Sequence, residues 1–272
     1  MFIKRISYYL TFITVGMLIS CKQTSQENQN LLIDSVETTS ELQKTAIKVP
    51  SPIELYIFMY NSKTKFLKEH LNPIDNYNKY NTKIKKALNL GVYSSDLAYC
   101  TVFKQNKETF AYFSVAKKLA DDLGLTEGFD ENIVKRIDAN MNNSDSLYQI
   151  TNDSYSTAIL FLEQQGKEDL LPLMITGAWI ESVNLAIKSV EKFDPENEIV
   201  VRIADQGLLL ENILEMYKYV KTDPEFTSII NKLLDLQSSY DKLLDNTNVI
   251  ITKKQYEEIV NKVKAIRAQF IG

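Results

Sequence analysis

Proline placement constrains the fold of this chain most, because every proline after residue 50 lies where a helix could begin. Proline fixes φ near about −65° and lacks a backbone N–H, so it suits the first helical turn and disrupts a helix interior. Ser51-Pro52-Ile53-Glu54 combines a Ser cap, Pro at the first helical position and Glu three residues after the cap. The same scheme recurs at Asn72-Pro73, Asp194-Pro195 and Asp223-Pro224, and Pro172 lies in the first turn of another helical segment. The pattern predicts an all-α fold.

Hydrophobic periodicity then places the helices, and strand signals are scarce because the chain has no Asn-Gly or Asp-Gly hairpin turn. Short connectors such as LGLTEGFD and QQGKED favour antiparallel neighbours. We predict a multi-helix antiparallel bundle of about 8–9 helices. The expected helices span about 52–68, 80–105, 107–123, 130–142, 145–165, 169–191, 195–220, 224–245 and 253–270.

The first twenty residues are typical of a targeting segment: Lys4 and Arg5 precede an apolar run, which ends in Leu18-Ile19-Ser20-Cys21. This ending resembles a bacterial lipobox, so residues 1–20 are predicted to be a lipoprotein signal peptide. Cys21 is then the lipidation site, carrying acyl chains such as palmitate. A transmembrane anchor is disfavoured because the run is shorter than the roughly 20 residues that span a bilayer. A plain secretory signal is the remaining alternative.

Residues 21–49 are polar and lack an apolar period, so they are expected to form a flexible lipid-anchored tether before a single helical domain over 50–272. Lys22 follows the cysteine where an Asp would favour inner-membrane retention, and no acidic run follows it. The expected location is the outer membrane, facing the periplasm.

Charge and cysteine content exclude two kinds of interaction. Removing residues 1–20 leaves 29 basic against 35 acidic residues, a net charge of −6, which gives no electrostatic basis for nucleic-acid binding. Membrane attachment is therefore expected through lipidated Cys21. Only Cys100 remains besides it, so no intrachain disulfide is expected.

Two helical segments share a local pattern that raises the possibility of an internal duplication. Gly91 and Gly177 each precede a small apolar residue and an aromatic residue, with an acid soon after. Segments 129–147 and 226–244 also align, although the offset grows from 86 to 97 residues. The 11-residue difference is close to three turns of about 3.6 residues, which keeps the buried face in phase. A duplicated four-helix unit, with halves 80–165 and 169–245, is one interpretation, and chance similarity of helices is the other.

Motifs for chemistry are scarce. His70 is the only histidine, and the chain lacks GxSxG, HExxH, P-loop, GxGxxG and Glu-x-x-His patterns. No catalytic residue, metal site or cofactor is predicted.

Asp96 is the leading candidate for a buried polar or ligand-binding residue, because it lies between Cys100 and Phe103 within the apolar arc of its helix. A carboxylate there needs a partner or a raised pKa, and Arg136 and Arg202 are the cations considered for it. Hydrogen bonds to tyrosine hydroxyls or a helix end are the structural alternative.

Glu181 and Arg202 complete the candidate set. Glu181 lies in a helix that is apolar on nearly all sides, which predicts a central helix, and its partner is expected to be Arg202, a lysine or solvent. Arg202 could instead form a solvated ion pair with Asp205 three residues later. In the last helix, 253–270, Arg267 is assigned to the polar face, and this helix is expected to close the bundle.

The stretches LNPIDNYNKYNTKIKKALNLGVYSSDLAY and ITGAWIES resemble a group of uncharacterised lipoproteins of Bacteroidota, over most of the mature domain. The resemblance implies an all-α fold and no established activity. The predicted function is a lipid-anchored cell-envelope binding or interaction module of unknown ligand, with an envelope protein or a small molecule as its partner. A small-molecule-binding or sensory domain is one alternative, and an enzyme of unknown reaction is the other.

Overall fold

The computed structural model describes residues 40–46, 48–125, 164–221, 224–246 and 250–272, with scattered residues between 132 and 162. These described residues form α-helices and short 3-10 turns and no strand, which confirms the all-α prediction. The predicted helices 130–142 and 145–165 lie outside the continuously described ranges. The α-helices are α2 (Glu41–Ala46), α3 (Ile53–Asn61), α4 (Lys83–Val102), α5 (Asn106–Asp122), α8 (Leu171–Ser189), α9 (Glu198–Ala204), α10 (Gln206–Met216), α11 (Pro224–Asp241) and α12 (Lys253–Ile271).

Helices α4 and α8 cross in direct backbone contact at two glycines. A Cβ added to Gly91 would lie 2.0 Å from the carbonyl oxygen of Met174, and one added to Gly177 would lie 1.9 Å from that of Leu88. Each glycine therefore faces the carbonyl three residues before the other glycine. Only glycine permits this approach, because every other residue carries the Cβ that would clash.

Two hydroxyl hydrogen bonds stabilise the crossing of α4 and α8. The Ser95 hydroxyl on α4 donates to the carbonyl oxygen of Ala178 on α8, 3.0 Å away. Tyr56 of α3 lies 2.6 Å from the Ser95 oxygen, and because the Ser95 proton is already donated, the tyrosine hydroxyl is the donor. All three hydroxyl and carbonyl groups are thus paired inside the core.

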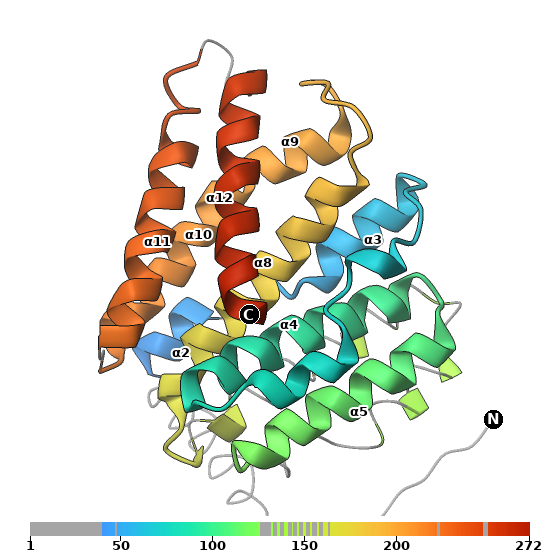
Figure 1. The fold of residues 1–272 in the computed structure, drawn as a ribbon, viewed down its shortest axis with the longest axis vertical. Coiled ribbons are helices and arrows are strands. Elements are labelled where there is room, and N and C mark those ends of the chain that lie inside the picture. The colour runs from blue at the N-terminus through green and yellow to red at the C-terminus, as the bar shows by residue number, and fades with distance from the viewer. Residues whose placement is uncertain are drawn as a thin grey trace, which may run out of the picture. The chain divides into compact units, whose positions relative to one another are not determined.

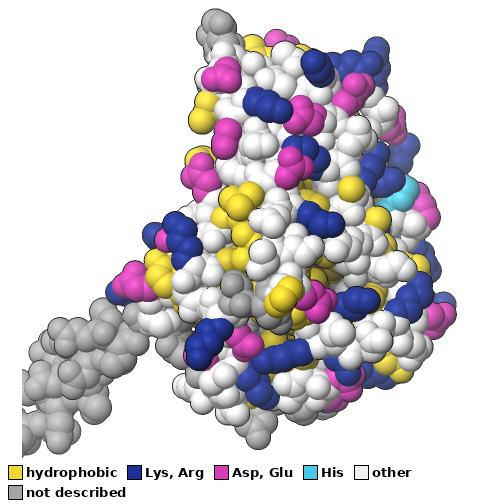
Figure 2. Space-filling model, turned by 60° about the vertical axis from the view of Figure 1, so that its left-hand side comes forward, with side chains coloured by type: hydrophobic (Ala, Val, Ile, Leu, Met, Phe, Trp, Pro, Cys, Tyr) yellow, Lys and Arg dark blue, Asp and Glu magenta, His cyan; other side chains and the backbone are white. Residues whose placement is uncertain are grey.

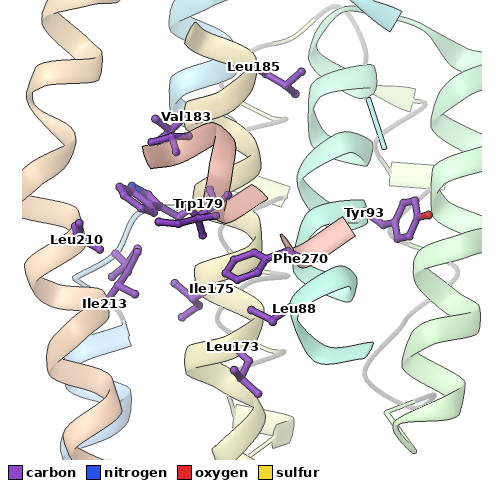
Figure 3. Close-up of a cluster of buried hydrophobic side chains, with 14 of the residues drawn as sticks. Leu88, Tyr93, Leu173, Ile175, Trp179, Val183, Leu185, Leu210, Ile213 and Phe270 are labelled. Atoms are coloured by element: carbon purple, nitrogen blue, oxygen red, sulfur yellow. The ribbon is translucent and has the colours of Figure 1, made fainter. Parts of the chain in front are cut away.

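Helix α8 is the central helix of the bundle. The helical stretch Glu168–Ser189 is apolar and long enough to cross a membrane, but 89% of its apolar window is buried inside the protein. It contacts α4 on one side and α10 and α12 on others. Trp179 of α8 lies between that helix and Leu210 and Ile213 of α10 (Figure 3), which joins the two halves of the core.

The remaining helices pack around this axis. Helices α4 and α5 run side by side, while α11 and α12 stand next to each other and α12 lies over α8 (Figure 1). Helix α12 is preceded by its N-cap Thr252, whose side chain forms a capping box with Gln255. Its far end is held by Asn89, which donates to the carbonyl oxygen of Phe270 at 2.8 Å.

The folded domain begins earlier than predicted. The expected tether extended to Val49, but Glu41–Ala46 forms α2 and the compact unit starts at Ser40. Leu42, Ala46 and Val49 are buried, and α2 packs against α10. Over the described residues 40–46, 48 and 49, the few apolar side chains become buried because other helices provide a partner surface.

Two predicted helices also end differently. The helix expected over 52–68 ends at Asn61. Two residues later, Lys63 adopts a left-handed backbone conformation with a φ of 62°. The helix expected over 195–220 divides at Asp205 into α9 and α10. Next to the break, a Cβ on Gly207 would lie 2.9 Å from the Cβ of Tyr240, so the glycine allows α10 to approach α11 closely.

The duplication stays a prediction, because its second match falls partly on residues outside the described ranges. The structure adds that the two aligned glycines, Gly91 and Gly177, contact each other's helices in a reciprocal way.

Replacing Gly91→Ala is expected to lower the free energy of unfolding by roughly 2–3 kcal/mol, because the new methyl group meets backbone that cannot rotate away. Alanine's better helix propensity, about 1 kcal/mol, offsets only part of this strain. Urea unfolding monitored by circular dichroism measures the change. Ser94→Ala on the same helix is the control, with an expected change within about 0.5 kcal/mol. Equal stability of the Gly91→Ala variant and wild type would show that the crossing is looser than described.

Candidate functional site: a buried polar cluster and two surface grooves

The α4–α8 crossing brings two of the three predicted site residues together. Asp96 lies five residues after Gly91 on α4, and Glu181 lies four residues after Gly177 on α8. Both side chains are fully buried. The close approach of the helix axes therefore places two carboxyl groups next to each other in the core.

Arg267 of α12 completes this buried cluster. Its Nε lies 2.5 Å from Glu181 Oε2 and its Nη2 lies 2.8 Å from Glu181 Oε1, a two-pronged ion pair. The same Nη2 donates to the carbonyl oxygen of His70 at 3.0 Å. A buried charge without a partner costs several kcal/mol, so Glu181 and Arg267 stabilise each other in this position.

Asp96 contacts a buried loop. Its Oδ2 accepts a hydrogen bond from the backbone N–H of Asn72 at 3.1 Å. Asn72 is itself fully buried, and its carbonyl oxygen accepts from the Tyr112 hydroxyl at 3.0 Å. The neighbouring Pro73 carbonyl accepts from Tyr93 at 2.8 Å. The side chains of Asp96, Arg267, Tyr93 and Tyr112 therefore pair with backbone polar groups between His70 and Pro73, where Leu71 and Asn72 are buried.

The protonation of the two carboxyls follows from their burial. Burial, and then the negative charge of Glu181, raises the pKa of Asp96 well above its usual range. Burial also raises the pKa of Glu181, but hydrogen bonding to Arg267 and to Asp96 opposes that effect. Asp96 Oδ1 has no donor facing it when the carboxyl is taken as ionised. Hydrogen bonding between the two carboxyls raises the pKa of Asp96 and opposes the rise in the pKa of Glu181, which favours the proton on Asp96 and the charge on Glu181.

Arg202 does not join the cluster, and the prediction that it or Arg136 partners a buried acid is wrong. Its guanidinium lies on the surface, 4.7 Å from the centre of the Phe58 ring. Arg136 lies instead near Asp153, at 3.6 Å. Arg202 belongs to α9 and lines a surface groove with Trp179 and Ser182 of α8, whereas Glu181 pairs with Arg267 of α12.

Arg267 was missed because it was assigned to the polar face of the last helix. Its spacing shows otherwise: Ile259, Val263 and Arg267 follow one another at intervals of four, so the arginine lies on the buried stripe. The side chain is only 14% exposed. A cation within an apolar helical stripe was the signal that could have identified Arg267 as a buried cation in need of an acidic partner.

The buried cluster is suited to holding the fold together. Glu181 is engaged by Arg267 and Asp96 is engaged by Asn72 and Glu181, so no member is free to face a ligand. Neither of the two surface grooves described below includes any of these three side chains. Within the described part of the chain, no group of three His, Cys, Asp or Glu side chains is placed to hold a metal ion.

Two surface grooves, each of about 340 Å³, meet at α9 and α10. Asp205 and Leu208 line both of them. Groove 1 is lined by Val49, Pro50, Ser51, Pro52, Glu54, Leu55, Phe58, Ile175, Ala178, Trp179, Ser182, Arg202, Asp205, Gln206, Leu208 and Leu209. Groove 2 is lined by Pro195, Val201, Ala204, Asp205, Gly207, Leu208, Glu211, Gln237, Tyr240, Asp241, Leu243, Leu244, Ile250 and Ile251.

Groove 1 has a paired polar floor. Trp179 Nε1 donates to Gln206 Oε1 at 2.9 Å, and Gln206 Nε2 donates to the carbonyl oxygen of Arg202 at 3.1 Å. The Ser182 hydroxyl donates to the Trp179 carbonyl at 2.8 Å. These contacts make groove 1 a preformed hollow with Arg202 at its edge.

Several exposed apolar side chains line groove 2. Leu208 is 70% exposed and Leu244 is 75% exposed, and Val201 and Ile250 are also exposed on its walls. Figure 2 shows apolar side chains interspersed with charged ones on one face of the protein. Three consecutive leucines, 208–210, were a sequence signal for this, because one helix cannot turn all three toward a single core.

Comparisons of the chain with protein-family models, with curated proteins and with solved structures found no match.

Replacing Asp96→Asn is expected to flatten the dependence of stability on pH. An amide keeps the acceptor for the Asn72 N–H and provides an N–H for Glu181, but it cannot ionise. In wild type, the folded state retains a proton above about pH 4, where the unfolded carboxyl has released it. The wild-type protein therefore loses up to about 1.4 kcal/mol per pH unit from this group as pH rises toward the raised pKa, and the variant does not.

Thermal and urea unfolding between pH 4 and pH 9 would measure these slopes, with Asp121→Asn on exposed α5 as the control. If the Asp96→Asn and wild-type slopes coincide, Asp96 is ionised in the folded protein and the assignment of its proton is wrong.

Proposed function

We propose that this protein is a lipid-anchored cell-envelope interaction module whose helical domain binds a partner protein at the face formed by grooves 1 and 2. The observation that carries the proposal is Leu208, which is 70% exposed on α10 and lines both grooves. Large contiguous apolar surfaces are rare on proteins that have no partner, and they mark interaction sites.

The placement of the buried ionisable side chains supports a binding function over a catalytic one. Asp96 and Glu181, the two buried carboxyl groups whose pKa values are raised, are engaged within the fold, and they lie outside both grooves. A catalytic site requires such groups to converge on a space that a substrate can enter.

A small molecule is the second candidate occupant, and groove 1 favours it. The volume of this groove, about 340 Å³, lies within the range of about 300–1,000 Å³ that ligand pockets occupy. The Trp179–Gln206 hydrogen bond preforms its floor, and the Arg202 guanidinium at its edge suits an anionic group on the ligand.

Anchoring through Cys21 is part of the proposal, and Cys21 lies outside the described residues. Its support is the lipobox-like sequence that follows the short apolar run. The proposed location is the outer membrane, with the helical domain facing the periplasm. A lipid anchor would keep the interaction face close to the membrane without a membrane-spanning segment.

Replacing Cys21→Ser is expected to move the protein from the membrane fraction to the soluble fraction of the cell, because the acylated thiol is lost. Fractionation followed by immunoblotting, together with mass spectrometry of the N-terminal peptide, tests this. Cys100→Ser is the control, since that cysteine is buried in the core and is expected to leave membrane attachment unchanged. Continued membrane attachment of the Cys21→Ser variant would contradict the anchor.

A photo-crosslinking amino acid placed at Leu208 or at Leu244 is expected to give a discrete higher-mass adduct in intact cells. Phe110 on α5 is the matched control, because it is also a large exposed apolar side chain, and it is expected to give no adduct. Mass spectrometry then identifies the crosslinked protein. Equal labelling at all three positions, or none at Leu208 and Leu244, would contradict a protein-binding face here.

A further inference from the structure

The lining of groove 2 is rich in hydrogen-bond acceptors and negative charge. Asp205, Glu211 and Asp241 are exposed carboxylates among its lining residues. No Lys, Arg or His is found among the described residues that line it. Around an apolar hollow, this arrangement favours an occupant that carries positive charge.

Two buried side chains of groove 2 add unpaired polar atoms. Tyr240 is 3% exposed, and its hydroxyl has no hydrogen-bond partner among the described residues. Gln237 is 8% exposed, and its Oε1 also lacks a partner there. Its Nε2 donates to Asp241 Oδ1 at 2.8 Å, and this contact fixes which end of the amide is the oxygen. An unpaired buried polar atom is unfavourable, so these two side chains would gain by turning toward an N–H donor that enters the groove.

The charge is suited to a side-chain cation more than to a bare metal ion. Metal sites need several ligands converging on one point, and the described residues contain no such group of three. Carboxylates spread along a groove instead match lysine or arginine side chains that are spaced along a polypeptide.

We infer that groove 2 binds an apolar segment of a partner protein that carries lysine or arginine beside its large apolar side chains. This inference rests on the proposed function and names the chemistry of its partner. Leu208 and Leu244 contact the apolar side chains of the segment, and Asp205, Glu211 and Asp241 pair with its cations. The Gln237 amide oxygen and the Tyr240 hydroxyl accept N–H donors.

The test uses the full mature chain with Cys21→Ser, so that no detergent competes for the peptide. Two labelled helical peptides share one leucine pattern and differ only in carrying lysine or glutamate at the polar positions. Fluorescence anisotropy at physiological salt is expected to show binding of the lysine peptide at least about tenfold tighter than that of the glutamate peptide.

Two sets of variants separate the groove from the overall acidity of the protein. The triple variant Asp205→Asn, Glu211→Gln and Asp241→Asn is expected to lose the preference for lysine. The control triple, Glu69→Gln, Asp75→Asn and Asp121→Asn, removes the same charge from exposed sites on other elements and is expected to retain it.

Tyr240→Phe gives a further readout that does not depend on net charge. It removes a hydroxyl that has no partner in the free protein, so the thermal stability should be unchanged or higher. Binding of the lysine peptide should weaken about tenfold.

Equal binding of the two peptides, or an equal loss in both triple variants, would overturn the inference. Failure of both peptides to bind would also overturn it, while photo-crosslinks at Leu208 would still support the proposed function independently.

Discussion

Backbone contact between α4 and α8 is the constraint on which the rest of the structure depends. Gly91 and Gly177 each lie against a carbonyl of the opposite helix, with no room for a Cβ. Because the helix axes come this close, residues one turn further along, Asp96 and Glu181, are brought into the same buried space. Larger residues at the crossing would separate the helices, and the two carboxyls would no longer lie next to each other.

The polar cluster that results links parts of the chain that are distant in sequence. Arg267 joins α12 to Glu181 and to the His70 carbonyl, while Asp96 holds the Asn72 N–H. An irregular segment that passes through a core must find donors and acceptors for its backbone, since water is absent there. The cluster supplies them, which gives a structural reason for placing ionisable groups in the interior.

Because these groups are engaged inside the fold, the features available to a partner lie on the surface. Division of the predicted helix 195–220 at Asp205 turns α9 and α10 in different directions, and grooves form on both sides of the corner. The apolar and acidic lining of groove 2 and the paired polar floor of groove 1 differ in chemistry. The two halves of this face are therefore suited to different parts of one partner, or to a protein and a small molecule.

The sequence by itself determined the fold class, the central position of α8 and the burial of Asp96, because helical periodicity and proline placement act over a few residues. Burial of α2, the early end of α3 and the division at Asp205 depended on surfaces provided by other helices, so local patterns misplaced them. The partner of Glu181 was likewise decided only by the tertiary structure. Arg267 is 86 residues away in the chain, and helical spacing can show that a side chain is buried but cannot show which distant helix it faces.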